Sequence, residues 1–210
     1  MTSTVETEPA SAGTLFGQRI ELARSFTESL AREGEERGLI GPLELPRLWT
    51  RHILNCAVVA PLLQTGALVG DIGSGAGLPG IVLAIARPDV RFVLIEPMER
   101  RVAWLQEQKD VLSLDNVEVL RARGEDAKSA GRLDQVTARA VSAFRKLLPI
   151  TAPLVRDGGE LVLMKGANAQ AEIDAASKEI RRFHIHDVRV EILGTGVVDE
   201  VTRVIRATVR

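Results

Sequence analysis

The sequence predicts an α/β protein with a Rossmann-like, mostly parallel sheet, a helical N-terminal cap and an antiparallel pair of strands at the C-terminal edge. Three observations predict this fold. After Gln64, short β-rich runs alternate with runs of helical periodicity, which is typical of a parallel sheet with helices on both faces. A glycine-rich turn follows the first β-rich run. The last two β-rich runs are joined by a connection too short for a crossover helix, so we expect them to pair antiparallel.

The N-terminal part divides into a tail and a cap. Residues 1–13 are low in hydrophobicity and lack periodicity, so a disordered tail is expected there. Apolar residues then recur at helical spacing over residues 15–30 and again over 48–58. We therefore assign residues 14–66 to a helical cap and residues 67–210 to the core, with both parts in one globular unit.

The core alternates between strands and helices in chain order. Strands are expected at residues 67–72 (ALVGDI), 91–97 (RFVLIEP), 116–120 (NVEVL), 135–140 (QVTARA) and 159–166 (GELVLMKG). Helices are expected at residues 79–86, 100–113, 142–155 and 168–183. The antiparallel pair is expected at residues 185–193 and 201–209.

Composition limits the class of protein. The chain has 210 residues, 45% of them hydrophobic, which is enough for one substantial core. There is no run of about eighteen apolar residues, and the first residues are polar and acidic, so we expect a soluble, cytoplasmic protein with no membrane partner. The single cysteine, Cys56, excludes an internal disulfide and a multi-cysteine zinc site, and no metal is expected. A monomer is expected because no long unpaired apolar face stands out.

Charge is divided unevenly along the chain. The net charge is −1, but residues 1–46 hold four basic and eight acidic side chains against 23 and 20 in the rest. Basic clusters occur at residues 100–101, 121–123, 145–146 and 181–182. Such clusters are compatible with a polyanion such as RNA, and equally with ordinary solvated faces.

The glycine turn predicts a nucleotide-like ligand. Gly75, Gly77 and Gly80 satisfy the spacing G-x-G-x-x-G, and Gly73 adds one more permissive position. Without β-carbons, such a turn can bend sharply and let a ligand approach the backbone. The spacing alone does not choose the ligand, since dinucleotide-binding proteins share it.

Acidic residues at the strand ends favour S-adenosylmethionine over a dinucleotide. Asp71, Glu96 and Glu125 follow three successive strands, so their carboxylates are expected at one edge of the sheet, where open α/β sheets bind ligands. These carboxylates would repel a pyrophosphate but attract a sulfonium cation. Glu96 is spaced to accept hydrogen bonds from ribose hydroxyls, and Glu125 is a candidate partner for the adenine amine. For each residue taken singly, a solvated charge at a strand end stays an open alternative.

Six segments carry a resemblance to a known family. RLWTRHILNCA, DIGSGAGLPGIVLAIARP, IEPMERRVAWL, RARGED, ARAV and LVLMKG, in this order, resemble the RsmG (GidB) family of bacterial 16S ribosomal RNA guanine-N7 methyltransferases, with actinobacterial members looking most similar. The chain departs from the family's pattern at Asn55-Cys56, at Gly70 and in the ARAV run. The first and the last of these departures affect the expected shape of the target-base pocket, whereas Gly70 should only loosen a strand.

The resemblance implies the class I S-adenosylmethionine-dependent methyltransferase fold and a set of site residues. It implies methyl transfer to guanine N7 in the decoding-region loop of 16S rRNA, within the small ribosomal subunit or its precursor. Arg139 is the expected catalytic residue. The cofactor is expected to be bound by Asp71, Gly73, Ser74, Gly75, Gly77, Leu78, Glu96, Pro97, Gly124, Glu125 and Arg139. RNA is expected to be bound by Arg51, His52, Arg139 and Lys165.

The chemistry expected at guanine N7 needs no general base. N7 holds an in-plane lone pair and no proton, so the protein has to supply alignment and electrostatics. Arg139, at the end of a strand, has a planar fork suited to a carboxylate, a guanine or a phosphate; a structural ion pair with Asp71 or Glu125 is the alternative. For His52 an ordinary contact with a helix or backbone group stays open, and for Lys165 a solvated strand end stays open.

Other functions remain compatible with the sequence alone. A class I methyltransferase acting on a protein or a small molecule would share the turn and the acids. An NAD(P)-dependent dehydrogenase would share the glycine spacing. A non-catalytic RNA-binding protein that kept the fold would bind the cofactor without turnover.

Overall fold

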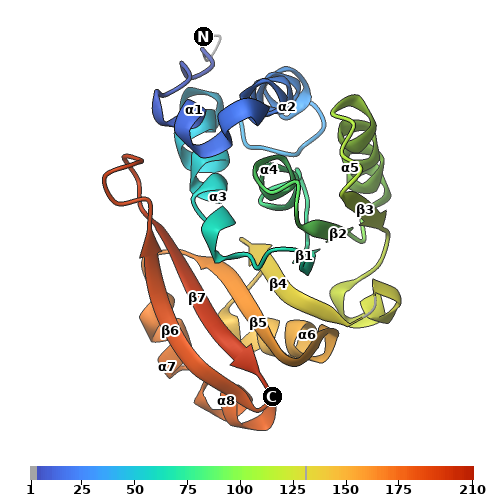
Figure 1. Ribbon diagram of the computed structural model, residues 1–210, viewed down its shortest axis with the longest axis vertical. Helices are drawn as coiled ribbons and strands as arrows, with labels where there is room; N and C mark the ends of the chain where they lie inside the picture. The colour runs from blue at the N-terminus through green and yellow to red at the C-terminus, as the bar shows by residue number, and fades with distance from the viewer. Residues whose placement is uncertain (1–3, 131) are drawn as a thin grey trace.

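The computed structural model describes residues 4–130 and 132–210, and its strands form one seven-stranded sheet in the order β3-β2-β1-β4-β5-β7-β6 (Figure 1). The neighbours β1–β2, β1–β4, β2–β3 and β4–β5 pair in parallel. The pairs β5–β7 and β6–β7 are antiparallel. The predicted parallel sheet with an antiparallel C-terminal edge is therefore confirmed.

The strands lie close to their predicted positions. They are β1 (Leu68–Ile72), β2 (Arg91–Ile95), β3 (Val117–Leu120), β4 (Leu133–Arg139), β5 (Val155–Lys165), β6 (Ile185–Leu193) and β7 (Thr202–Val209). Because alternate side chains of a strand point to opposite faces, each inner strand contributes to two cores. Phe92 and Leu94 pack on one side of β2, and Val93 and Ile95 pack on the other.

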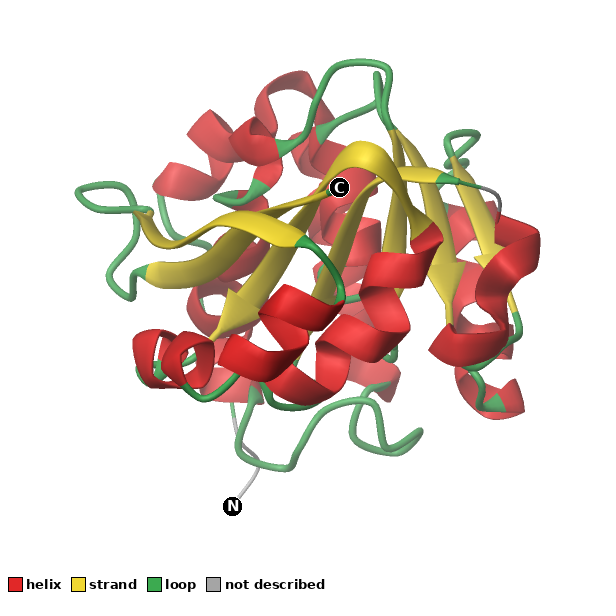
Figure 2. Ribbon diagram, turned by 90° about the horizontal axis from the view of Figure 1, so that it is seen from below, coloured by secondary structure: helices red, strands yellow, loops and turns green. Residues whose placement is uncertain are grey.

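Helices cover both faces of the sheet (Figure 2). One core joins the sheet to the N-terminal cap and to α4 (Gly80–Ala86) and α5 (Glu99–Val111). The opposite core joins it to α6 (Phe144–Thr151) and to the α7 and α8 region, where Ala169 and Ala176 are buried. The helix expected over residues 168–183 is two helices, α7 (Ala169–Asp174) and α8 (Ser177–Arg182).

The cap consists of short helical pieces in place of two continuous helices. Gly17 has a positive φ of +52° and separates the first helix from the second. The pieces are α1 (Ser11–Phe16), η1 (Gly17–Arg19), α2 (Ile20–Glu33), η2 (Leu45–Arg47), the π-helical η3 (Leu48–Leu54), α3 (Asn55–Ala57) and η4 (Ala60–Leu62). Their buried side chains belong to the same core as β1 and α4.

The tail expected over residues 1–13 packs against the cap where the structure describes it. Ala12 is fully buried within α1. Upstream, both carboxylate oxygens of Glu8 accept hydrogen bonds from Arg24, at 2.6 and 2.9 Å. Low hydrophobicity predicted disorder, but one ion pair and one buried alanine attach this segment to α2. Residues 1–3 lie outside the described residues.

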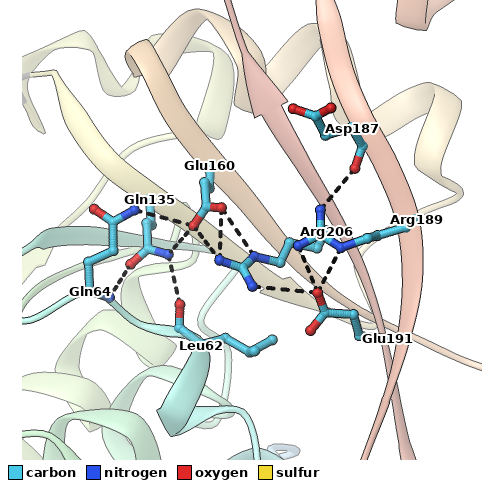
Figure 3. A network of polar contacts seen from close by, with 8 residues as sticks. All are labelled: Leu62, Gln64, Gln135, Glu160, Asp187, Arg189, Glu191 and Arg206. Carbon is cyan, nitrogen blue, oxygen red and sulfur yellow. Dashed lines mark hydrogen bonds and ion pairs between the residues drawn. The ribbon is translucent and has the colours of Figure 1, made fainter.

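A polar network centred on the buried Gln135 connects the cap to the sheet away from the glycine turn (Figure 3). Gln135, fully buried on β4, accepts a hydrogen bond from the Gln64 amide at 2.8 Å and donates to the Leu62 carbonyl at 3.0 Å. It also donates to Glu160, which binds Arg206 of β7 through both carboxylate oxygens. The network connects three neighbouring strands to the segment that enters β1.

We expect Gln135→Leu to lower the free energy of unfolding by roughly 1 to 3 kcal/mol, because it leaves the partly buried backbone amide of Gln64 and carbonyl of Leu62 without their partner. Urea unfolding measures the change. The matched control is Gln170→Leu, at an exposed position of α7, for which the change should stay within about 0.5 kcal/mol. Equal effects of the two substitutions would contradict a stabilising role for this network.

No helix within residues 4–130 and 132–210 is long and apolar enough to cross a membrane. Over the same residues, no group of three or more His, Cys, Asp and Glu side chains is placed to hold a metal ion.

Candidate active site at the carboxyl ends of the strands

The glycine turn connects the end of β1 to the start of α4. Gly73 and Gly75 have positive φ angles of +70° and +54°, in the region that favours glycine. Gly80 begins α4 and donates its amide to Asp71 Oδ2 at 3.0 Å. A β-carbon at Gly80 would lie 2.5 Å from that same oxygen, so the close approach of helix and strand requires glycine there. Trp104, fully buried on α5, stabilises the turn by donating its indole N–H to the Ala76 carbonyl at 3.0 Å.

Asp71 supports the turn from inside the protein. Its side chain is fully buried, and Oδ1 has no hydrogen-bond partner among the residues that the structure describes. Burial raises the pKa of Asp71 to about 7, and the Gly80 amide opposes this shift. Because the folded protein then holds a proton that the unfolded chain releases, stability falls as pH rises from about 4 to 7.

We expect Asp71→Asn to remove this pH dependence, since the amide oxygen can still accept from Gly80 and no charge is buried. The variant should gain stability over the wild type progressively between pH 4 and 7, by a few kcal/mol at most, with a constant difference at higher pH. Urea unfolding at pH 4.5, 6 and 8 measures it. A difference that does not change with pH would show that Asp71 titrates normally.

Glu96 lies at the end of β2 and faces the turn. Its side chain is only 2% exposed, and each carboxylate oxygen accepts one backbone amide: Oε2 from Gly75 and Oε1 from Met98, both at 3.0 Å. A carboxylate can accept about four hydrogen bonds, so Glu96 keeps acceptor capacity for a ligand. It borders a cavity of about 570 Å³, a volume typical of small-molecule sites.

Arg139, at the end of β4, forms part of the wall between this cavity and a second one of about 550 Å³. Both cavities are also bordered by Arg51, His52, Ala140 and Val141. No ion pair joins Arg139 to Asp71 or to Glu125 within the described part of the chain; its guanidinium instead contacts His52 Nδ1 at 3.0 Å and the Arg51 carbonyl at 3.4 Å. We name the two spaces the turn cavity and the cap cavity.

The structure brings most of the expected cofactor residues together. The turn cavity is bordered by Gly73, Ser74, Gly75, Leu78, Glu96, Pro97 and Arg139. Asp71 and Gly77 are buried and do not border the cavity. Gly124 and Glu125 lie beyond β3 and also stand apart from it. A β-carbon at Gly124 would meet Ile150, and Glu125 is exposed.

The expected RNA-binding residues differ in accessibility. Arg51 is 46% exposed and borders both cavities. Lys165 borders the cap cavity, but its side chain is only 6% exposed. Its ammonium donates to the Ser142 carbonyl at 2.6 Å and pairs with Glu172 at 2.9 Å. These contacts connect β5 to the loop after β4 and to α7.

Several residues at the cavities escaped sequence reasoning. The turn cavity is also bordered by Leu39, Ile40 and Glu44, from the loop between α2 and η3, and by Met98 and Arg101 after β2. Arg101 carried a signal, since it belongs to a basic pair next to Glu96 in the sequence. The loop residues carried none, because only the folding of the cap places them opposite the glycine turn.

Comparison with solved structures shows that this fold is shared with methyltransferases. A precorrin-6y C5,15-methyltransferase from Geobacter metallireducens has a TM-score of 0.54 and 18% identity, and the match covers 73% of this chain and 86% of that one. A predicted O-methyltransferase from Agrobacterium tumefaciens has a TM-score of 0.59 and 18% identity, with coverage of 74% and 80%. At this identity the likeness shows the fold alone, and it confirms the class I methyltransferase fold.

Sequence comparison shows the family. A protein from Leifsonia xyli named ribosomal RNA small subunit methyltransferase G is 73% identical over all 210 residues of both chains. A protein of the same name from Clavibacter michiganensis is 68% identical over 98% of this chain and 97% of its own. The family described as rRNA small subunit methyltransferase G (GidB) matches residues 19–200. The chain therefore belongs to the rRNA small subunit methyltransferase G family.

Proposed function

We propose that this protein, an S-adenosylmethionine-dependent rRNA methyltransferase, transfers the methyl group to N7 of a guanosine in the decoding-region loop of 16S rRNA. The observation that carries the proposal is the pair of adjoining cavities that share Arg139 as a wall. A methyl transfer between two bound molecules needs two neighbouring sites, and alignment across their boundary supplies much of the rate. We assign the turn cavity to the cofactor and the cap cavity to the target base.

The residues of the turn cavity fit S-adenosylmethionine. Glu96 is a buried carboxylate with acceptor capacity left after its two backbone amides, as ribose hydroxyls require. Its negative charge favours a cation over a pyrophosphate. Arg139 and Arg101 border the same cavity and can donate to the methionine carboxylate. When bound, the cofactor supplies a methyl group on a sulfonium, which a neutral nucleophile can attack. Gly124 and Glu125, which follow β3, stay in this proposal as candidate contacts of the adenine.

The cap cavity requires orientation of a base without removal of a proton. Guanine N7 carries a lone pair, so attack on the methyl group needs no general base. The Arg139 guanidinium has only donors, and it can bind guanine O6 or a flanking phosphate while the N7 lone pair stays free. In this proposal Arg139 is the catalytic residue, and Arg51 binds the RNA at the rim, where it is exposed.

Lys165 receives a different role from the one expected from the sequence. Because its ammonium is paired with Glu172 and donates to the Ser142 carbonyl, it has little capacity left for a phosphate. We propose that it holds the loop after β4, and with it Arg139, against β5 and α7.

The proposal also constrains the state of the RNA. A-form duplex RNA hides guanine N7 in a deep, narrow groove that side chains do not read. The target therefore lies in a loop of folded RNA within the small subunit or its precursor. We propose that the protein acts on it as a cytoplasmic monomer.

Equilibrium binding separates the cofactor assignment from the dinucleotide alternative. By isothermal titration calorimetry we expect S-adenosylhomocysteine to bind and NAD to show no binding at the same concentration. Because the target is proposed to lie in folded RNA, we expect methyl transfer to small-subunit particles in preference to isolated oligonucleotides of the same sequence. NAD binding without S-adenosylhomocysteine binding would overturn the assignment of the turn cavity.

A further inference from the structure

Three side chains form a continuous chain of hydrogen bonds at the wall between the two cavities. Glu44 Oε2 lies 2.5 Å from His52 Nε2. On the other side of the imidazole ring, His52 Nδ1 lies 3.0 Å from Arg139 Nη2. Glu44 comes from the loop before η2, His52 from η3 and Arg139 from the end of β4. The cap and the sheet therefore meet at this imidazole.

The contact with Arg139 determines the tautomer of His52. A guanidinium only donates hydrogen bonds, so Nδ1 accepts and carries no proton. The single proton of the neutral ring is then on Nε2, which donates to the Glu44 carboxylate. Both contacts are satisfied in this one state, which is the neutral Nε2–H tautomer.

A protonated His52 is incompatible with the same arrangement. Protonation would place an N–H on Nδ1, directly against the N–H of Arg139, and two cations would then be in contact. Burial and the Arg139 charge together lower the pKa of His52, although Glu44 opposes them. His52 is accordingly neutral at neutral pH, with its side chain 12% exposed.

Building on the proposed methyl transfer, we propose that Glu44 and His52 are positioning residues that hold the Arg139 guanidinium between cofactor and target base, and that protonation of His52 releases it. The Arg51 carbonyl accepts a second, longer contact from Arg139. Without the imidazole acceptor, that contact alone leaves the guanidinium free to turn into either cavity.

Among the charged groups around His52, the imidazole is the one expected to change its protonation state near neutral pH. Burial would raise the pKa of Glu44, but hydrogen bonds from Arg47 and His52 hold it below its ordinary value, so Glu44 stays ionised where His52 titrates. Arg51 lies 3.7 Å from both Glu44 and Glu200, so its charge is partly balanced. The charged groups that face His52 are Glu44, Arg51 and Arg139, with Arg47 and Glu200 behind them.

Two amide substitutions distinguish the roles of the two imidazole nitrogens of His52. In His52→Asn the amide oxygen lies near the place of Nδ1 and can accept from Arg139. In His52→Gln the amide reaches the place of Nε2 and leaves Arg139 without its acceptor. We expect kcat to fall by roughly 10- to 100-fold in His52→Gln and by clearly less in His52→Asn. S-adenosylhomocysteine affinity should fall less than kcat in either variant, because Arg101 and Glu96 border the turn cavity independently of His52. His186→Gln, at an exposed position of β6, is the matched control with unchanged kcat.

The pH dependence of kcat gives a second test, because a purely structural role of His52 would not change it. Wild-type kcat should be level above about pH 6.5, the ordinary pKa of histidine, and fall as His52 is protonated below it. Glu44→Gln should move this fall to lower pH, because the carboxylate stabilises the imidazolium. In His52→Asn the decrease of kcat that comes from protonation of His52 should be absent.

Nitrogen NMR of the imidazole tests the arrangement without any turnover. We expect Nδ1 of His52 to be unprotonated and Nε2 protonated at pH 8; a proton on Nδ1 would overturn the inference. Wild-type kcat in His52→Gln, an equal loss in the two amide variants, or an unmoved pH profile in Glu44→Gln would also overturn it. If the wild-type protein transfers no methyl group to rRNA, the proposed function fails, and with it the positioning role, even where NMR finds the expected tautomer.

Discussion

Replacing Arg139 with alanine should lower kcat/KM for methyl transfer to small ribosomal subunits by roughly 100-fold or more, while the melting temperature changes little. Arg139 is half-buried, and in the described structure it makes no ion pair, so its removal leaves no carboxylate uncompensated. What the substitution removes is the set of donors between the two cavities. Steady-state transfer of a radiolabelled methyl group, with thermal unfolding on the same samples, measures both effects.

The control for Arg139 is Arg32→Ala, which removes an exposed arginine of α2 on the cap. Its activity and melting temperature should both match the wild type. Arg139→Lys should recover only part of the activity, because a single ammonium cannot reproduce the planar fork. A large drop in the melting temperature of Arg139→Ala with activity intact would show that Arg139 is a structural residue.

The second large effect is expected at Glu96. Glu96→Ala should weaken S-adenosylhomocysteine binding by roughly 1 to 3 kcal/mol, or about 5- to 150-fold, the range for loss of a charged hydrogen-bond partner. Its two oxygens also accept the amides of Gly75 and Met98, so the substitution loosens the turn that borders the cavity. Isothermal titration calorimetry gives the affinity directly.

Glu99→Ala is the matched control for Glu96. Glu99 lies three residues further along the chain, its side chain is 78% exposed, and it pairs with Arg121 at 3.1 Å. Its removal should leave the cofactor affinity unchanged. If Glu96→Ala binds S-adenosylhomocysteine as tightly as the wild type, the assignment of Glu96 to the ribose is wrong.

Local signals were sufficient to predict the sheet. Every strand lies close to its predicted position, although β5 begins at Val155 instead of residue 159, because the β-rich runs are short, are bounded by turn residues and alternate with helical patterns. The glycine turn and Glu96 were also predictable, since strand order and the meeting of strand ends at one edge of a parallel sheet follow from the same alternation. Proximity of Gly75 to Glu96 is thus a consequence of β1 pairing with β2.

Contacts between distant segments could not be predicted in the same way. Glu44 and His52 meet Arg139 only because the cap folds against the end of β4, and no local pattern encodes that approach. The same holds for Lys165. Its position at the end of a strand suggested a free cation, but the folding of α7 places Glu172 where it pairs with the Lys165 ammonium. Glu125 follows β3 as expected, but the turn that begins at Gly124 leaves its side chain exposed and away from the turn cavity.

The proposed function is tested most directly by methyl transfer from radiolabelled S-adenosylmethionine to small ribosomal subunits purified from a strain that lacks this protein, followed by nucleoside analysis of the 16S rRNA. We expect the label to appear in 7-methylguanosine, to map to the decoding-region loop and to be greatly reduced by Arg139→Ala. Label in a different nucleoside would contradict the N7 assignment. Absence of label from the RNA, with S-adenosylhomocysteine bound tightly, would contradict the substrate and leave only the cofactor assignment of the turn cavity.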